Sequence, residues 1–164
     1  MLIGVISDTH DNIGSVERAV KVFNEWGVSL VVHCGDWCAP FTLVKFKDLR
    51  CKLVGVFGNV DGERELLRRR ARELKFEVEG EFLHLVLNGR SIAVYHGVYE
   101  DIVRALAKCG EYDIVLRGHT HRAEVQKLGN CIVVNPGEAC GYLTGRRTVA
   151  IVNLETLDVR IIEL

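Results

Sequence analysis

The chain has few residues that would divide it into separate units. Its 164 residues include only two prolines, Pro40 and Pro136, and no linker rich in proline, glycine and serine. We find no internal repeat either. A chain of this length buries roughly two-thirds of its unfolded surface when it folds. We therefore expect residues 1–164 to form one domain.

Long apolar segments and an excess of one charge are also missing. The first apolar stretch, MLIGVIS, is interrupted at Asp8, so it is too short for a signal peptide or a membrane span. The 21 Lys and Arg residues are balanced by 22 Asp and Glu residues, for a formal net charge of −1. This balance gives no support to binding of a nucleic acid polymer. We expect a cytoplasmic protein without a membrane partner.

The six cysteines include no CxxC pair. Several lie inside apolar runs, where a thiol packs as a small hydrophobic group. Cys34 and Cys38 flank Asp36 and could suggest a zinc site, but thiolate zinc sites usually use paired cysteines. We expect reduced cysteines with structural roles.

Five apolar runs each end beside a residue that can bind a metal. They are LIGVIS before Asp8, LVVHCG before Asp36, KLVGVFG before Asn59, SIAVY before His96 and DIVLRG before His119. Short runs of this kind predict buried β-strands, and ligand-binding loops collect where strands end. The sequence therefore predicts that the polar chemistry gathers at one edge of the fold.

Helices and strands alternate in the first half. Asn12 can cap a helix whose apolar stripe ends at Gly27. We expect further helices from Pro40 through Phe46 and from about Asp61, with the strand LVGVF between them. The arginine-rich run 68–72 falls on the polar side of the third helix, which predicts a solvated face and not a phosphate site.

Antiparallel hairpins dominate the second half. Asn88-Gly89 separates FLHLVL from SIAVYH, and Gly129-Asn130 and Glu155-Thr156 separate two further pairs of strands. One helix is expected from about Tyr99 to Lys108. The pattern predicts an α/β fold, a four-layer αββα sandwich with two mixed β-sheets packed face to face and helices outside.

The candidate metal ligands follow a repeated spacing. Asp8 and His10 are two residues apart, as are His119 and His121. In an extended backbone such pairs point to the same side and can converge on one cation. Asp36 and Asn59 each follow a glycine, and His96 precedes one, so a tight turn can present each side chain.

Together these candidates supply two carboxylates, four imidazoles and one amide oxygen: Asp8, His10, Asp36, Asn59, His96, His119 and His121. This mixture suits manganese, iron, cobalt, nickel or zinc better than calcium or magnesium. Two neighbouring divalent ions repel each other, and a shared carboxylate reduces that cost, so we take Asp36 as the bridge. Such a centre is formally positive and suits an anionic phosphate ester, which a bridging hydroxide could attack.

Each position also has a structural interpretation. Asp8 could cap the helix that follows it, and Asn59 could occupy a turn while Asp61 caps the third helix. A single buried histidine is more often a core residue than a ligand, which is what we expect for His33 and His84. The coincidence of all seven candidates at strand ends favours a metal site.

The ordered motifs Asp8-Thr9-His10, Gly35-Asp36, Gly58-Asn59, His96-Gly97 and Gly118-His119-Thr120-His121 resemble those of calcineurin-like metallophosphoesterases. The resemblance runs from residue 8 to Asn135-Pro136-Gly137. The short length is similar to the compact bacterial and archaeal phosphodiesterase branch, which also contains the phosphoesterase-like retromer subunit. It implies that one metal is held by Asp8, His10 and His121, and the other by Asn59, His96 and His119. It also implies that Asp36 bridges them and that Asp36, Asn59 and His96 are catalytic.

Two residues depart from that family pattern. Many members have a histidine directly after Gly-Asn, where this chain has Val60, which cannot donate a proton. Its absence would favour esters with acidic leaving groups, or a substitute acid. Glu138 follows Asn-Pro-Gly, where serine is common, and an extra carboxylate near phosphate could repel the substrate.

We therefore expect a dinuclear metal-dependent phosphodiesterase that hydrolyses a small or nucleotide-derived phosphate ester. Two divalent transition-metal ions are expected in each chain, manganese first, with nickel, iron, cobalt and zinc as alternatives. The alternative function is a non-catalytic protein-interaction scaffold on the same fold. Exposed hairpin edges are compatible with a homodimer.

Overall fold

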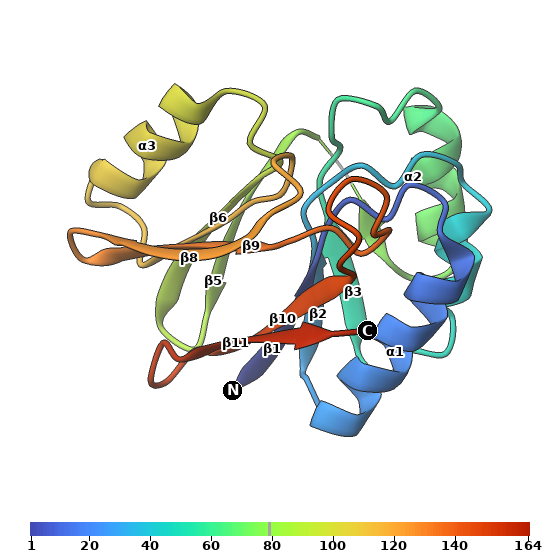
Figure 1. Cartoon of the computed structure of the whole chain (residues 1–164), viewed down its shortest axis with the longest axis horizontal. Coiled ribbons are helices and arrows are strands. Elements are labelled where there is room, and N and C mark those ends of the chain that lie inside the picture. The colour runs from blue at the N-terminus through green and yellow to red at the C-terminus, as the bar shows by residue number, and fades with distance from the viewer. Residues whose placement is uncertain (79) are drawn as a thin grey trace.

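Two β-sheets pack face to face, and helices cover both outer sides (Figure 1). The computed structural model describes residues 1–78 and 80–164. The first sheet has the strand order β11-β10-β1-β2-β3-β4, and the second has the order β5-β6-β7-β9-β8. Each sheet contains both parallel and antiparallel pairs, so the predicted αββα sandwich with mixed sheets is confirmed.

The strands of the first sheet are β1 (Leu2–Ile6), β2 (Leu30–His33), β3 (Lys52–Gly55), β4 (Glu77–Val78), β10 (Thr148–Asn153) and β11 (Val159–Glu163). Those of the second are β5 (Phe82–Leu87), β6 (Arg90–Tyr95), β7 (Ile114–Leu116), β8 (Ala123–Leu128) and β9 (Cys131–Pro136). The helices are α1 (Ile13–Trp26), α2 (Arg64–Glu73) and α3 (Glu100–Lys108), with a short 3₁₀ helix, η1 (Thr42–Phe46).

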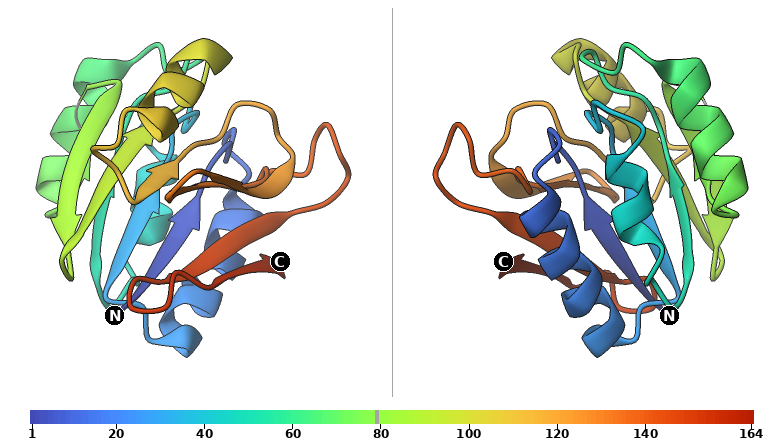
Figure 2. Two further views of the ribbon diagram at one scale, coloured as in Figure 1. Left: turned by 90° about the vertical axis from the view of Figure 1, so that its left-hand side faces the viewer. Right: turned by 90° about the vertical axis from the view of Figure 1, so that its right-hand side faces the viewer.

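Parallel pairing brings the important loops to one edge. Strands β1, β2 and β3 are parallel neighbours in the first sheet, and β6 and β7 are parallel neighbours in the second. Parallel strands end at the same side of a sheet, so the loops that follow these five strands meet at one rim. Figures 1 and 2 show these loops gathered at one end of the sandwich.

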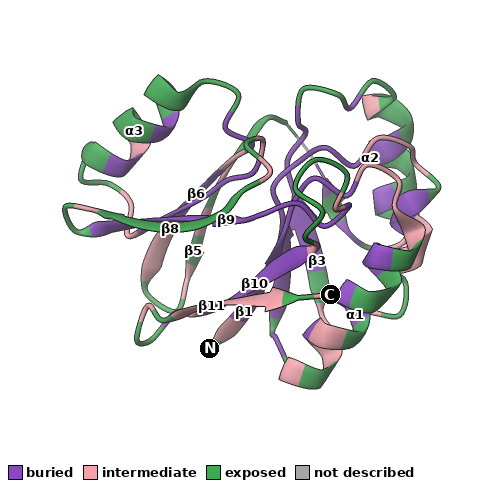
Figure 3. Cartoon of the chain, viewed as in Figure 1, coloured by how far each residue is buried: buried purple, intermediate pink, exposed green. Residues whose placement is uncertain are grey.

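The apolar core forms three layers. The layer between the sheets includes Ile3, Val32, Ile92 and Leu116, which are fully buried. A second layer lies between the first sheet and α1, η1 and α2, and a third lies between the second sheet and α3. The central strands of both sheets are therefore buried, while β8, at the edge of the second sheet, and the outer faces of the helices are exposed (Figure 3). None of the helices within the described residues is long and apolar enough to cross a bilayer.

Helix α1 begins and ends where its capping residues predict. The Asn12 side chain accepts a hydrogen bond from the Ser15 backbone N–H at 3.1 Å. Gly27 closes the helix in the left-handed region at φ 62°. Asn12, and not Asp8, is therefore the cap, and the alternative interpretation of Asp8 as a helix cap is wrong.

Other helix predictions need correction. The segment from Pro40 through Phe46 forms only the short η1, from Thr42 to Phe46. The third helix begins at Arg64 and not near Asp61, because the Asp61 side chain bonds to loop backbone instead of capping a helix. The two-residue strand β4 was not anticipated. The three hairpins are confirmed, including the tight turn that pairs Leu87 with Arg90.

Candidate metal centre

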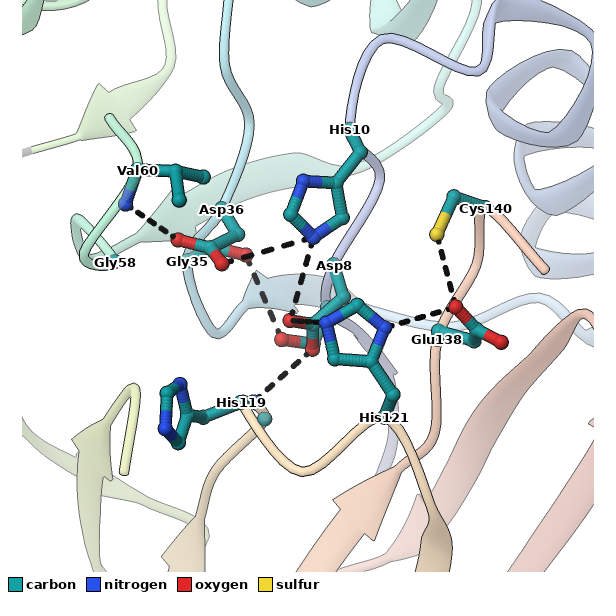
Figure 4. Close-up of polar contacts among 12 residues, drawn as sticks. Asp8, His10, Gly35, Asp36, Gly58, Val60, His119, His121, Glu138 and Cys140 are labelled. Carbon is teal, nitrogen blue, oxygen red and sulfur yellow. Dashed lines mark hydrogen bonds and ion pairs between the residues drawn. The ribbon is translucent and has the colours of Figure 1, made fainter. Parts of the chain in front are cut away.

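Four of the seven candidate ligands converge from three strand ends. Ligand atoms of Asp8, His10, Asp36 and His121 all lie within 4.8 Å of one another. His121 Nε2 is 3.3 Å from Asp8 Oδ1, and His10 Nε2 is 3.6 Å from Asp36 Oδ2. Figure 4 shows these side chains pointing toward a common point from the loops after β1, β2 and β7. The spacing suits a single cation held by nitrogen and oxygen.

The other three candidates form a second group that also contacts Asp36. His119 Nδ1 is 3.0 Å from Asn59 Oδ1, and the rings of His96 and His119 meet edge to face at 5.3 Å. His96 Nε2 is 3.3 Å from Asp36 Oδ2, the same oxygen that faces His10. Asp36 therefore stands between two ligand groups, as a bridging carboxylate would.

The backbone at these residues is not extended, contrary to the expectation for the i, i+2 pairs. Asp8, His10 and Asp36 have φ values of 53°, 39° and 60°, and His119 and His121 have values of 69° and 61°. All five lie in the left-handed region, which costs a non-glycine residue about 1–3 kcal/mol. Asp8 and His10 do converge, with His10 Nε2 3.8 Å from Asp8 Oδ1. His121 faces Asp8 whereas His119 pairs with Asn59, so the second pair does not point to one cation as expected. Left-handed turns set these directions. Such strain accumulates at functional sites because the surrounding structure imposes it.

Glycines allow these loops to approach one another closely. A Cβ on Gly58 would overlap the Asp36 carboxylate and would lie 2.6 Å from the Asp36 backbone nitrogen. A Cβ on Gly118 would overlap the Ser7 hydroxyl and lie 2.6 Å from Asp8 Oδ2. Both glycines are therefore needed for space at carboxylates of the cluster, and not only for a turn.

Buried polar atoms in the cluster lack partners in a way that fits a cation. Asp8 Oδ1, His10 Nε2 and His96 Nε2 are buried and have no hydrogen-bond partner among the described residues. Buried polar atoms are normally paired, because leaving one unpaired costs about 1–3 kcal/mol. These three atoms all face the interior of the cluster. A divalent ion with nitrogen and oxygen ligands would satisfy them.

Hydrogen bonds behind the rings orient two of the histidines. His96 Nδ1 is 2.8 Å from the Cys34 carbonyl oxygen, and His121 Nδ1 is 2.8 Å from Glu138 Oε2. Each partner accepts the Nδ1 proton, so Nε2 is left without a proton and faces the cluster. Outer contacts of this kind raise the basicity of a metal-binding imidazole and fix its direction.

Asp36 is poised to stay ionised. Burial is the largest influence and by itself would raise the pKa of Asp36, but the neighbouring His96, the Val60 backbone N–H and His10 together outweigh it, and the net pKa lies below the ordinary value. The Val60 backbone N–H also donates to Asp36 Oδ1 at 3.1 Å. The carboxylate therefore presents negative charge between the two ligand groups.

Glu138 lies behind His121 and does not face the open site, contrary to the expectation that it could repel phosphate. The side chain is fully buried. Figure 4 shows His121 between Glu138 and Asp8. Burial alone would raise the pKa of Glu138, but donors from His121, Thr144 and Cys140 lower it to about 2. It also accepts from the Leu143 backbone N–H at 3.1 Å. Glu138 is therefore an anion whose charge is balanced by hydrogen-bond donors. It orients His121 and anchors the loop that follows Glu138 itself.

Replacing Glu138 with Gln should weaken manganese binding about 10- to 100-fold, since the uncharged amide no longer polarises and orients His121. Isothermal titration with manganese, combined with circular dichroism to verify the fold, measures this. The matched control is Glu73→Gln, which alters a half-exposed carboxylate on α2. Equal manganese affinity in Glu138→Gln and the wild type would show that Glu138 serves only the loop.

Sequence reasoning missed the role of Asp61. Its buried carboxylate accepts hydrogen bonds from the backbone N–H groups of Asp36, Cys38 and Gly58 at 3.0, 2.8 and 2.7 Å. It ties the loop after β2 to the loop after β3. The available signal was its position three residues after Gly58, where an Asp side chain often bonds to the backbone of its own turn.

The two remaining histidines have different surroundings. His33 is buried, stacks on Trp37 at 3.5 Å between ring centroids, and bonds to the Thr9 hydroxyl at 3.1 Å. Burial lowers the pKa of His33 well below the ordinary value, so it is a neutral core residue, as expected. His84 is exposed and pairs with Ser91, so its prediction as a buried core residue is wrong. All six cysteines are free thiols, as predicted.

Comparison with known sequences gives matches along the whole chain. The family described as the calcineurin-like phosphoesterase superfamily domain matches residues 1–157. Phosphodiesterase MJ0936 of Methanocaldococcus jannaschii is 34% identical over 165 residues, which cover 100% of this chain and 99% of the relative. The probable metallophosphoesterase MJ0623 of the same organism is 35% identical over 147 residues, which cover 84% of this chain and 67% of the relative.

Known structures agree with these sequence matches. An archaeal phosphodiesterase superposes with a TM-score of 0.96 at 34% identity, with 100% of both chains covered. Vps29 of Entamoeba histolytica, in a complex with Zn²⁺, gives a TM-score of 0.73 at 18% identity, covering 100% of this chain and 98% of that one. The second likeness concerns the fold alone.

Proposed function

Because this chain belongs to the calcineurin-like phosphoesterase superfamily, we propose that it is a phosphodiesterase whose metal centre is built from the seven side chains gathered at the strand ends. The family implies divalent metal ions and a phosphate-ester substrate. The observation that carries the proposal is the convergence of Asp8, His10, Asp36 and His121 within 4.8 Å around buried atoms without partners.

We assign the ligands to two ions. Asp8, His10 and His121 would hold one ion, and Asn59, His96 and His119 would hold the other. Asp36 would touch both, because its Oδ2 lies 3.6 Å from His10 Nε2 and 3.3 Å from His96 Nε2. The mixture of imidazole, carboxylate and amide favours manganese, with iron, cobalt, nickel and zinc as alternatives.

Bound divalent ions supply Lewis-acid polarisation of phosphoryl oxygens and activation of water. The protein contributes position and charge. Glu138 and the Cys34 carbonyl hold His121 and His96 in one orientation, and Asp61 fixes the loop that presents Asp36. Val60 follows Asn59, and its side chain cannot donate a proton to a leaving group. We therefore expect esters with acidic leaving groups to be hydrolysed faster than esters with basic leaving groups.

Removal of metal should abolish turnover of bis(p-nitrophenyl) phosphate. After treatment with a chelator and removal of the chelator, added manganese should restore the rate, since the ligand set cannot act without its ions. Release of p-nitrophenol measures both steps. Activity that persists in metal-free protein, or returns in buffer without added metal, contradicts the proposal.

The alternative function is a non-catalytic interaction scaffold. The structural likeness of this chain to Vps29 shows only a shared fold, because the sequence identity is 18%. The four site histidines, His10, His96, His119 and His121, are all present and converge in this chain. Hydrolysis of bis(p-nitrophenyl) phosphate separates the two functions, because a scaffold would hydrolyse this ester no faster than buffer that contains manganese.

A further inference from the structure

A cavity of about 270 Å³ lies beside the metal centre and shares two residues with it. Asn59 and His96 form part of its lining, and the remainder comes from the loop after β3, the start of α2, the residue before β5, the end of β6 and the loop after β6. A larger cavity, of about 690 Å³, lies at the beginning of β7 and shares none of the seven candidate ligands. The smaller cavity is therefore the one in position to receive part of a substrate whose phosphate lies at the centre.

The walls of this cavity are aromatic and aliphatic. Tyr95, Val98 and Tyr99 line it, and Tyr99 is 66% exposed although it lies next to a polar site. The Tyr99 backbone N–H donates to the Tyr95 hydroxyl at 3.3 Å, which joins the two aromatic residues at the wall. Exposed apolar side chains that gather beside a cavity indicate a binding surface. These walls suit a flat, apolar face of an occupant.

An ion pair in the lining of the cavity joins Arg64 and Glu81. Arg64 donates to Glu81 Oε1 at 2.6 Å, to the Gly58 carbonyl at 3.2 Å and to the Asp61 carbonyl at 3.1 Å. These three bonds commit the guanidinium to the protein, while the Glu81 side chain remains 61% exposed. The guanidinium therefore has few N–H donors left for an anion, whereas a ring carrying N–H donors would find an acceptor at Glu81.

We propose that this cavity binds the planar nitrogenous base of a nucleotide ester, with the base against Tyr99 and its polar edge toward Glu81. The proposal rests on the proposed phosphodiesterase function and defines its substrate class. The cavity, of about 270 Å³, lies just below the roughly 300–1,000 Å³ of pockets for drug-sized molecules, so it suits part of a substrate whose phosphate lies at the metal centre. Stacking against aromatic side chains accepts any base, since every base has a π-face.

Binding to the manganese-loaded protein tests the site without any need for turnover. Adenosine 5′-monophosphate and ribose 5-phosphate carry the same phosphate and sugar and differ by the base. By isothermal titration we expect the wild type to bind adenosine 5′-monophosphate roughly 5- to 150-fold more tightly, the range that base stacking gives. Tyr99→Ala should remove most of that difference and leave the affinity for ribose 5-phosphate unchanged.

Tyr142→Ala is the matched control, because Tyr142 is 62% exposed but does not line this cavity. It should keep the preference for the nucleotide. Equal affinities of the two ligands in the wild type, or loss of the preference in Tyr142→Ala and not in Tyr99→Ala, would overturn the proposal. Failure of the phosphodiesterase function appears separately, as absence of bis(p-nitrophenyl) phosphate hydrolysis by the same manganese-loaded protein.

Discussion

Asp36→Asn should lower the turnover of bis(p-nitrophenyl) phosphate by about 10³-fold or more in the presence of manganese. Asp36 Oδ2 lies 3.6 Å from His10 Nε2 and 3.3 Å from His96 Nε2, so one substitution removes the negative charge shared by both ligand groups. Metal ions contribute several kcal/mol of charge stabilisation, and each 1.36 kcal/mol is a factor of ten in rate. Steady-state kinetics with saturating manganese measures the loss.

The substitution should leave the fold intact, because asparagine has nearly the same shape and can still accept the Val60 N–H bond. A matched control is Asp101→Asn, which makes the same chemical change at an exposed position on α3. The control should retain wild-type turnover. Comparable rates in Asp36→Asn and the wild type, with unchanged metal content, would contradict the assignment of Asp36 as the shared ligand.

Gly58→Ala should reduce kcat/KM by at least about 100-fold through steric displacement of Asp36. The new Cβ would overlap the Asp36 carboxylate and would lie 2.6 Å from the Asp36 backbone nitrogen. That nitrogen is held by Asp61, so the loop cannot move aside without losing a buried hydrogen bond. A displacement of about 1 Å at a reacting centre costs around 10²-fold in rate. Kinetics, with a melting curve for each variant, gives the result.

Gly62→Ala is the control for this prediction. A Cβ at Gly62 meets no heavy atom within 4 Å, and its φ lies outside the left-handed region. It lies four residues further along the same loop and should keep both activity and stability. If Gly58→Ala is as active as Gly62→Ala, the close contact between Gly58 and Asp36 has no part in shaping the centre.

Local sequence signals predicted many of the helix ends and hairpin turns. Asn12 and Gly27 set the two ends of α1, and Asn88-Gly89 set the turn between β5 and β6, because capping and tight turns depend on residues close in the chain. The same signals were weaker at Asp61, whose side chain bonds to Asp36, 25 residues earlier in the chain, and does not begin a helix. The local sequence pattern does not show whether a side chain will form its hydrogen bonds with nearby or with distant residues.

The sequence by itself determined which side chains are available for the centre: seven candidate ligands, each beside or near the end of an apolar run, within residues 1–157 that one family matches. Tertiary structure decided how they meet. Five of them adopt left-handed backbone, Gly58 and Gly118 permit the close approach of loops, and Glu138 is buried behind His121. The physical reason is that these features depend on packing between segments far apart in the chain, which imposes strained dihedrals and pairs a buried carboxylate with distant donors.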